Sequence, residues 1–428
     1  MKKPPSAADL RGLARLATEA TQNVTRIAEG VHQSVWSTLG MPEGDQPGKT
    51  RGITGLVYRS VLDITGAVGW GIDKAISGFE STLQPLLKAI DEAGPESPQR
   101  AAMIAALNGV LGDHLEASGN ALQLPMTLRV DGQIVMTGDA QGQAIVEDEL
   151  GAMTGVSGHL VLMLHGLCMN DLQWRSSKSS QSHADRLGAA DDCTPVHIRY
   201  NSGRHISQNG RLLATLLQSL VDEWPVPVRS LSIIGHSMGG LLARSAFHYA
   251  AEAGLSWPSQ CKAFVSLGTP HHGSPLERAG NWVDVILGST RHTAPFAKLG
   301  QLRSAGITDL RFGNIRDEDW QDRDRFERSG DTRTAMPLPA GITCYTIAAS
   351  TAPRPRAISD RIVGDGLVPV ASALGQHEEG DRHLEFEPDK QFICYGCHHM
   401  QLLYHPEVTE KLLTWLAPLH AGGKALVE

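Results

Sequence analysis

The spacing of apolar residues along this 428-residue chain changes near residue 122. Before that point, apolar residues recur at every third or fourth position, which is typical of amphipathic helices. From Met126 onward, short apolar runs separated by glycine-containing turns predict strands instead. The pattern therefore predicts a helical N-terminal region over residues 1–122 and an α/β domain over residues 123–428.

Glycines and prolines divide the helical region. We expect a first helix from about Leu10 to Val35, an interrupted helical stretch over residues 55–90 and a third helix over residues 101–115. Two roles are open for this region. It would add packing surface against the rest of the chain or against a second copy, giving a homo-oligomer, or it would contact a lipid surface. Its aromatic residues favour lipid contact, whereas the lack of a strongly basic polar face argues against it.

The second part begins with an expected hairpin over Met126–Val135, which turns at Asp131-Gly132. Fully apolar runs then predict buried strands, with helix-compatible stretches between them and a helix near the C-terminus. Such runs are typical of a mostly parallel central sheet flanked by helices. The expected strands cover residues 159–164, 231–234, 263–267, 342–347 and 391–394.

About 75 residues separate the strand that ends at Leu267 from the strand that begins near Ile342, which is too many for a plain loop in a compact domain. We interpret residues 276–340, approximately, as a helical lid or cap, because an insertion here would overhang the edge of the sheet. The charged run 316–325 is expected to be a solvated helix face. Helices are predicted near residues 282–287, 296–302 and 320–326.

The strongest chemical signal is the sequence Gly-His-Ser-Met-Gly at residues 235–239, between an apolar strand and a helix-compatible stretch. A G-x-S-x-G sequence in this setting predicts a nucleophile elbow, which presents the serine hydroxyl at a helix N-terminus. Glycine on both sides allows neighbouring backbone to approach closely. Ser237 is therefore the expected nucleophile.

The partners that such a serine needs follow later in the chain. Asp365 stands in a glycine-flanked turn after the strand 342–347, and the pair His398-His399 follows the strand 391–394. Imidazole would take the serine proton, and the carboxylate would fix the imidazole tautomer. The order serine, acid, histidine is that of α/β-hydrolase triads.

An oxyanion hole is expected from two backbone N–H groups. The strand 159–164 ends in His165-Gly166-Leu167, where α/β-hydrolases place the loop that supplies one donor. The residue after the nucleophile supplies the other. We therefore expect Leu167 and Met238 to hold the oxyanion through their N–H groups.

Six segments of the chain, spread over roughly residues 126–420, resemble the α/β-hydrolase superfamily, in particular bacterial lipase-like and GPI inositol-deacylase-like serine esterases. The resemblance implies an α/β-hydrolase fold with a helical lid insertion and an extra helical N-terminal region. It implies Ser237, Asp365 and His399 as nucleophile, acid and base. His399 is favoured over His398 because a Leu-Leu pair follows the family's histidine. The six segments are residues 165–167, 200–204, 235–239, 268–274, 364–368 and 399–403.

Further residues at the ends of the strands are expected to line a substrate pocket, since α/β folds bind ligands there. For three of them, His165, Asn201 and His271, the alternative of bracing their own loops stays open. No carboxylate stands at metal-ligand spacing from His271 and its neighbour His272, so no metal is predicted, and no cofactor is expected. The full pocket set is His165, Gly166, Asn201, His236 and His271.

Composition narrows the partners and the compartment. A net charge of −8 and a pI near 6.1 argue against a nucleic-acid partner, which normally needs a concentrated basic face. No apolar signal segment follows the basic N-terminal residues, and no apolar stretch near them could span a membrane, so a cytoplasmic protein is expected. Cys394 and Cys397 have C-x-x-C spacing; we interpret them as structural thiols, with a disulfide or a metal site less favoured.

The resemblance implies hydrolysis of a carboxylic ester, either of a small molecule or of a lipid, through an acyl-enzyme on Ser237. The same three residues would serve an acyltransferase, a thioesterase or an amidase. A non-catalytic binding protein on the same fold is the alternative from another class.

Overall fold

The computed structural model describes seven ranges of the chain. The helices expected before residue 98, and those near 282–287 and 296–302, lie outside these ranges, so lipid contact and oligomerisation through the N-terminal region stay predictions. None of the helices in the described ranges is both long and apolar enough to cross a membrane. The described residues are 98–120, 122–139, 142–174, 181–274, 303–323, 330–355 and 364–420.

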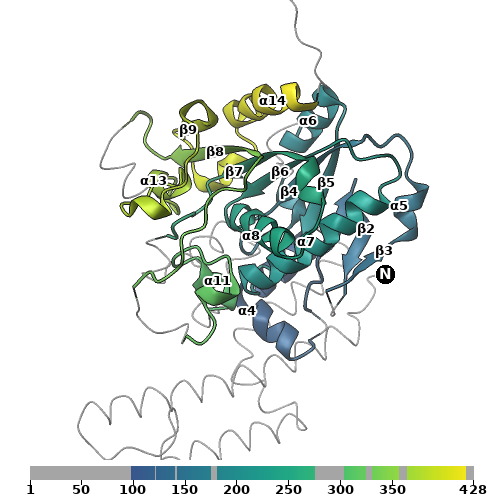
Figure 1. Ribbon diagram of the computed structural model, residues 1–428, viewed down its shortest axis with the longest axis horizontal. Coiled ribbons are helices and arrows are strands. Elements are labelled where there is room, and N and C mark those ends of the chain that lie inside the picture. The colour runs from purple at the N-terminus through teal and green to yellow at the C-terminus, as the bar shows by residue number, and fades with distance from the viewer. Residues whose placement is uncertain are drawn as a thin grey trace, which may run out of the picture. The chain divides into compact units, whose positions relative to one another are not determined.

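The described residues form a sheet with the strand order β3-β2-β1-β5-β4-β6-β7-β8-β9 (Figure 1). Neighbours from β5 to β9 are parallel, and β1 to β3 add an antiparallel edge. The predicted parallel sheet and the hairpin turn at Asp131-Gly132 are confirmed. The strands are β1 (Thr127–Val130), β2 (Gln133–Gly138), β3 (Ala144–Val146), β4 (His159–Leu164), β5 (Thr194–Arg199), β6 (Ser230–His236), β7 (Cys261–Leu267), β8 (Thr343–Ser350) and β9 (Gln391–Tyr395).

Helices cover both faces of the sheet. On one face lie α7 (Ile206–Glu223) and α8 (Met238–Glu252), and on the other lie α6 (His183–Asp191) and α14 (Pro406–His420) (Figure 1). Further described helices are α4 (Pro98–Ala117), α5 (Asp148–Ala152), α11 (Ala305–Asp309) and α13 (Val370–Ala373), with the 3-10 helices η1 (Asp171–Trp174), η2 (Trp257–Gln260), η4 (Asp317–Asp319), η5 (Gly380–Arg382), η6 (Pro388–Lys390) and η7 (His399–Leu403).

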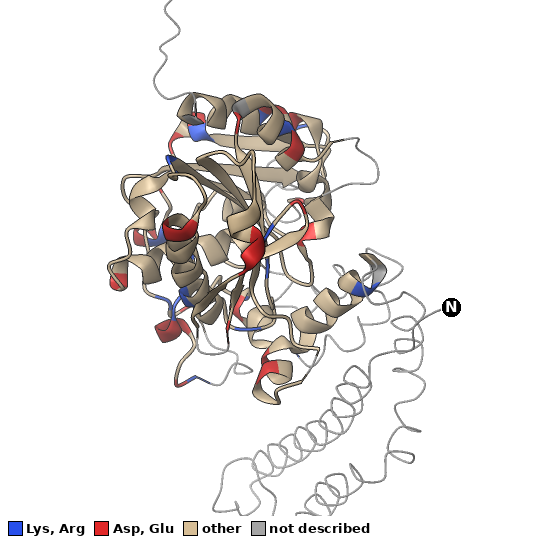
Figure 2. Ribbon diagram, turned by 90° about the vertical axis from the view of Figure 1, so that its right-hand side faces the viewer, with Lys and Arg blue, Asp and Glu red and all other residues tan. Residues whose placement is uncertain are grey.

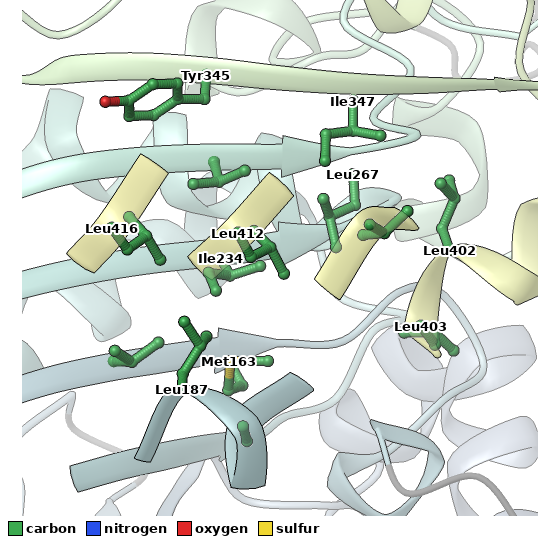
Figure 3. Packing of buried hydrophobic residues seen from close by; sticks show 14 of the residues in the cluster. Met163, Leu187, Ile234, Leu267, Tyr345, Ile347, Leu402, Leu403, Leu412 and Leu416 are labelled. Atoms are coloured by element: carbon green, nitrogen blue, oxygen red, sulfur yellow. The ribbon is translucent and has the colours of Figure 1, made fainter. Parts of the chain in front are cut away.

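Apolar side chains fill the space between the sheet and the pair α6 and α14 (Figure 3). Strands β4, β6, β8 and β9 contain no charged residue, and the charged residues of the described ranges lie mainly on helices and connecting segments (Figure 2). A parallel sheet covered on both faces needs such apolar strands. This core contains Met163, Leu187, Ile234, Leu267, Ile347, Leu402, Leu403, Leu412 and Leu416.

Helix α4 is part of the α/β body, although it precedes the predicted domain boundary at residue 122. Its residues Ala101–His114 form one compact unit with the residues from Leu124 onward. The Asn201 side chain donates to the Gly112 carbonyl at 2.9 Å. A Cβ atom at Gly109 would lie only 2.3 Å from the Cys168 sulfur. The helix therefore packs directly on the loops that follow β4 and β5.

The described part of the expected lid is also built into the body. All residues of α11 are buried. The Ser304 hydroxyl donates to the Gly109 carbonyl at 2.6 Å, and Trp320 stacks on the His205 ring at 3.6 Å between ring centroids. Whether residues 276–302 cover the site lies outside the described residues, so a lid function stays a prediction.

The charged run 316–325 is partly the solvated face that the sequence predicts, because Glu318 and residues 321–323 are exposed. Residues 317–319 form the short 3-10 helix η4, and Asp319 is buried. One Asp319 oxygen accepts the N–H groups of Ile315 and Arg316, both at 3.0 Å. The Asp319 carboxylate therefore accepts hydrogen bonds from backbone N–H groups that would otherwise lack a partner in this turn. The number of charged residues in the run does not predict such a contact.

Candidate active site

Ser237 stands in the turn between β6 and α8. Its φ of 56° and ψ of −123° lie in a region that side-chain-bearing residues rarely adopt, at a cost of about 1–3 kcal/mol. The Ser237 N–H donates to the Leu267 carbonyl at 2.8 Å. Glycine is required on both sides of Ser237. A Cβ atom on residue 235 would lie 2.5 Å from the Gly240 nitrogen, and a Cβ atom on residue 239 would lie 2.5 Å from the Leu164 oxygen.

This close approach makes Gly239→Ala a test of the turn. The added methyl would push against backbone of β4, so we expect the free energy of unfolding to fall by about 1–3 kcal/mol, measured by urea denaturation. The matched control is Gly151→Ala in α5, where an added Cβ meets nothing within 4 Å. Equal stability of the two variants would contradict the close approach.

The acid and the histidine form a buried pair. His399 Nδ1 lies 2.7 Å from Asp365 Oδ2, and the other carboxylate oxygen accepts the N–H groups of Leu367 and Val368 at 2.9 and 2.8 Å. With a carboxylate at Nδ1, the ring proton is assigned to that atom, and Nε2 is free to accept. His398 is exposed and its N–H bonds to the Gln401 side chain, so the fold places His399 against Asp365.

One glycine borders Ser237 and another borders the pair. A Cβ atom at Gly166 would lie 3.0 Å from Ser237 Cβ, and one at Gly268 would lie 3.2 Å from both His399 Cε1 and Asp365 Oδ2. Ser237 Oγ and His399 Nε2 are both buried, and neither has a hydrogen-bond partner within the described ranges. Buried polar atoms without partners are uncommon and call for an explanation, such as a reacting group.

Of the two expected oxyanion donors, Met238 follows Ser237 directly, and Leu167 follows Gly166, which borders Ser237. Met238 is the first residue of α8, where backbone N–H groups have no intrahelical acceptor. Leu167 follows Gly166 in the turn after β4. The next residue, Cys168, has a φ of 60°, and its N–H donates to the Ser202 hydroxyl at 3.0 Å. The sequence did not predict a role for Cys168 and Ser202 in this turn, because neither the φ of Cys168 nor its hydrogen bond to Ser202 leaves a pattern in the neighbouring residues.

His165 is buried beneath this turn with both ring nitrogens bonded to protein. Nδ1 lies 2.8 Å from the Gly166 oxygen, and Nε2 accepts the Tyr200 N–H at 3.3 Å, which assigns the proton to Nδ1. Burial lowers the pKa of His165 to about 4, so the ring is neutral. The His165 side chain therefore braces the turn at Gly166 and Leu167.

The other expected pocket residues are buried too. His236 lies beside His399, with Nε2 at 3.2 Å from the His399 oxygen and the two rings 4.7 Å apart. Asn201 spans Gly112 and its own turn, and His271 bonds through Nε2 to the Ser266 hydroxyl at 3.2 Å. Gly166 lies directly against Ser237, since a Cβ atom on this glycine would be 3.0 Å from Ser237 Cβ.

The buried neutral histidines predict acid sensitivity. Burial lowers the pKa of both His165 and His183 to about 4. Because the unfolded chain binds protons near pH 6.5, stability is complete above that pH and falls toward pH 4 by about 1.4 kcal/mol per pH unit for each histidine. Urea unfolding at pH 7 and pH 5 measures the slope. His183→Gln should reduce it, whereas the exposed-site change His398→Gln should not.

In the sheet, β5 lies on one side of β4 and β6 lies on the other. The order of the strands therefore reverses between β4 and β6, and Ser237 lies at the carboxyl end of β6. Ligands of α/β folds bind at such switch points. Residues 155–325 match the family model described as PGAP1-like alpha/beta domain. The fold of the described residues is the predicted α/β-hydrolase fold, with Ser237 directly after β6, Asp365 after β8 and His399 after β9.

The family match to the PGAP1-like domain includes Leu167 and Ser237 but ends before Asp365 and His399. The assignment of the last two therefore depends on the geometry of the pair. No curated protein matches the chain.

Several solved structures are similar to this chain at low identity. Bacillus licheniformis lipase BlEst2 in mature form is 16% identical, with 61% of this chain and 91% of that chain covered and a TM-score of 0.37. A Pyrobaculum calidifontis esterase is 14% identical (75% and 90% covered, TM-score 0.37), and the RedJ thioesterase of Streptomyces coelicolor is 16% identical (63% and 91% covered, TM-score 0.33). Similarity at this level says nothing about the activity of this chain.

Proposed function

We propose that this protein is a serine hydrolase that cleaves carboxylic esters through an acyl-enzyme intermediate. The observation that carries the proposal is a pair of buried atoms, Ser237 Oγ and His399 Nε2, that have no hydrogen-bond partner among the described residues, with Asp365 behind the imidazole at 2.7 Å. A buried hydroxyl on a strained elbow, next to an oriented base, is the arrangement that nucleophilic catalysis requires.

The mechanism follows from these positions. Ser237 Oγ attacks the ester carbonyl while its proton passes to His399 Nε2, and Asp365 stabilises the imidazolium. The N–H groups of Leu167 and Met238 hold the oxyanion of the tetrahedral intermediate. The leaving alcohol takes the proton from Nε2, and the acyl group stays on Ser237. Water then attacks the acyl-enzyme with His399 again as base, which releases the acid and restores the hydroxyl.

The immediate surroundings support an ester with an apolar acyl group. Cβ atoms at Gly166 and Gly268, which border the site, would lie 3.1 Å from Met169 Sδ and 2.7 Å from Leu402 Cδ1. Both side chains are buried and apolar. An acyl chain bound beside them would be removed from water, which favours binding by about 0.8 kcal/mol per buried methylene group.

Two measurements test the proposal. A fluorophosphonate probe should label the wild-type protein and not Ser237→Ala, and nitrophenyl esters from acetate to palmitate should be hydrolysed with a preference that defines the acyl pocket. Matched thioesters, amides and added alcohol acceptors separate hydrolysis of esters from the thioesterase, amidase and acyltransferase alternatives. A protein that is neither labelled nor active on any of these substrates would be a binding protein, and the proposal would be wrong.

A further inference from the structure

Two cysteines and a histidine meet behind the histidine loop. One ligand atom each from Cys394, Cys397 and His405 lies within 4.8 Å of the other two. Cys394 Sγ is 3.4 Å from His405 Nδ1. Both cysteines are fully buried, while His405 is half-buried. On sequence grounds no metal is expected here, because a single C-x-x-C pair lacks further ligands; the fold supplies the third.

We propose that Cys394, Cys397 and His405 bind a thiolate-preferring divalent ion, Zn²⁺ first among them. Zinc bonds of about 2.3 Å to sulfur and about 2.0 Å to nitrogen place tetrahedral ligand atoms roughly 3.5–3.8 Å apart, which the cluster accommodates. Each thiol releases its proton to solvent as its thiolate binds the ion. Since His405 borders solvent, water completes the tetrahedron.

The donor set favours an ion over a thiol pair alone. A disulfide would use only the two cysteines and would leave the His405 nitrogen, 3.4 Å from Cys394 Sγ, without a role. Two thiolates and an imidazole nitrogen are typical zinc ligands, and thiolates select zinc over magnesium or calcium.

The position of the cluster gives the ion a structural consequence. Its ligands lie at the end of β9 and just before α14, and the segment between them carries His399. That segment is held to the sheet by the Gly396 and Cys397 N–H groups, which donate to the Ala352 and Ser350 carbonyls at 2.8 and 3.0 Å. A bound ion would tie both ends of the segment together. This inference does not depend on the proposed function.

Cobalt titration of the full-length, reduced and chelator-treated protein tests the site. We expect one Co²⁺ per chain, with thiolate-to-cobalt bands in the near-ultraviolet and the strong visible bands of a tetrahedral ion, both displaced by Zn²⁺. Cys394→Ser and Cys397→Ser should abolish the thiolate bands, and His405→Ala should weaken Co²⁺ affinity at least about tenfold. Cys261→Ser, which removes a buried thiol on β7, is the control and should keep the full spectrum.

Absence of thiolate bands in the wild-type protein would overturn the site, as would bands that persist in Cys394→Ser. If the reduced protein binds no Co²⁺ but forms a Cys394–Cys397 disulfide in air, the pair is a redox pair and the proposal is wrong. Because the spectrum reports on ligands and not on turnover, this result is independent of ester hydrolysis.

Discussion

Replacing Ser237 by alanine should lower kcat on an activated ester by about 10⁶-fold and leave the melting temperature nearly unchanged. Alanine keeps the Cβ atom and the backbone of the elbow but removes the attacking oxygen. Folding loses little, because Ser237 Oγ makes no hydrogen bond to any described residue. Steady-state kinetics on nitrophenyl butyrate, with thermal unfolding of the same samples, measure both effects.

The matched control for this variant is Ser259→Ala, which removes a hydroxyl from η2 on the outside of the molecule. It should keep wild-type kcat. If Ser237→Ala retained more than about a hundredth of wild-type activity while probe labelling excluded a contaminating esterase, another residue would be the nucleophile.

Changing Asp365 to asparagine should lower kcat by about 10⁴-fold with little loss of stability. The asparagine oxygen can still accept the N–H groups of Leu367 and Val368, so its amide group would point toward His399. That amide donates where the carboxylate accepts, which forces the imidazole proton onto Nε2, the atom that must take the serine proton. Turnover and urea unfolding of the purified variant measure the two effects.

His398→Ala is the control that separates the neighbouring histidines. His398 is exposed, and the histidine bonded to the Asp365 carboxylate, at 2.7 Å, is His399, so loss of His398 should leave kcat near the wild-type value. A loss comparable to that of Asp365→Asn would instead make His398 the base and contradict the proposed role of His399.

The sequence predicted the sheet well because its signals are local. The expected strand 159–164 coincides with β4, and the apolar run 231–234 lies within β6. Burial on both faces leaves such strands almost without polar residues, so a short window of sequence suffices to find them. The elbow was equally readable, because close backbone approaches at Gly235 and Gly239 demand glycine at fixed spacing.

Contacts between distant segments were not predictable in the same way. Asn201 reaches a carbonyl 89 positions away in α4, and the His183 ring bonds to the Leu402 oxygen 219 positions away. A single Asn or His belongs to no repeating pattern of residues, so the sequence does not indicate which distant residue it will contact. The same holds for His405 beside Cys394, since only the turn after η7 brings them together.

The packing of α4 bears on how the protein is divided for experiments. Shortening the chain to start at residue 123, where the apolar spacing changes, would strip away the buried side chains of Ala106, Leu107 and Val110. It would also remove the Gly109 backbone from its place against Cys168, next to the turn at Gly166 and Leu167. A minimal version should start ahead of Pro98, so that this helix is retained as an interior element of the α/β body.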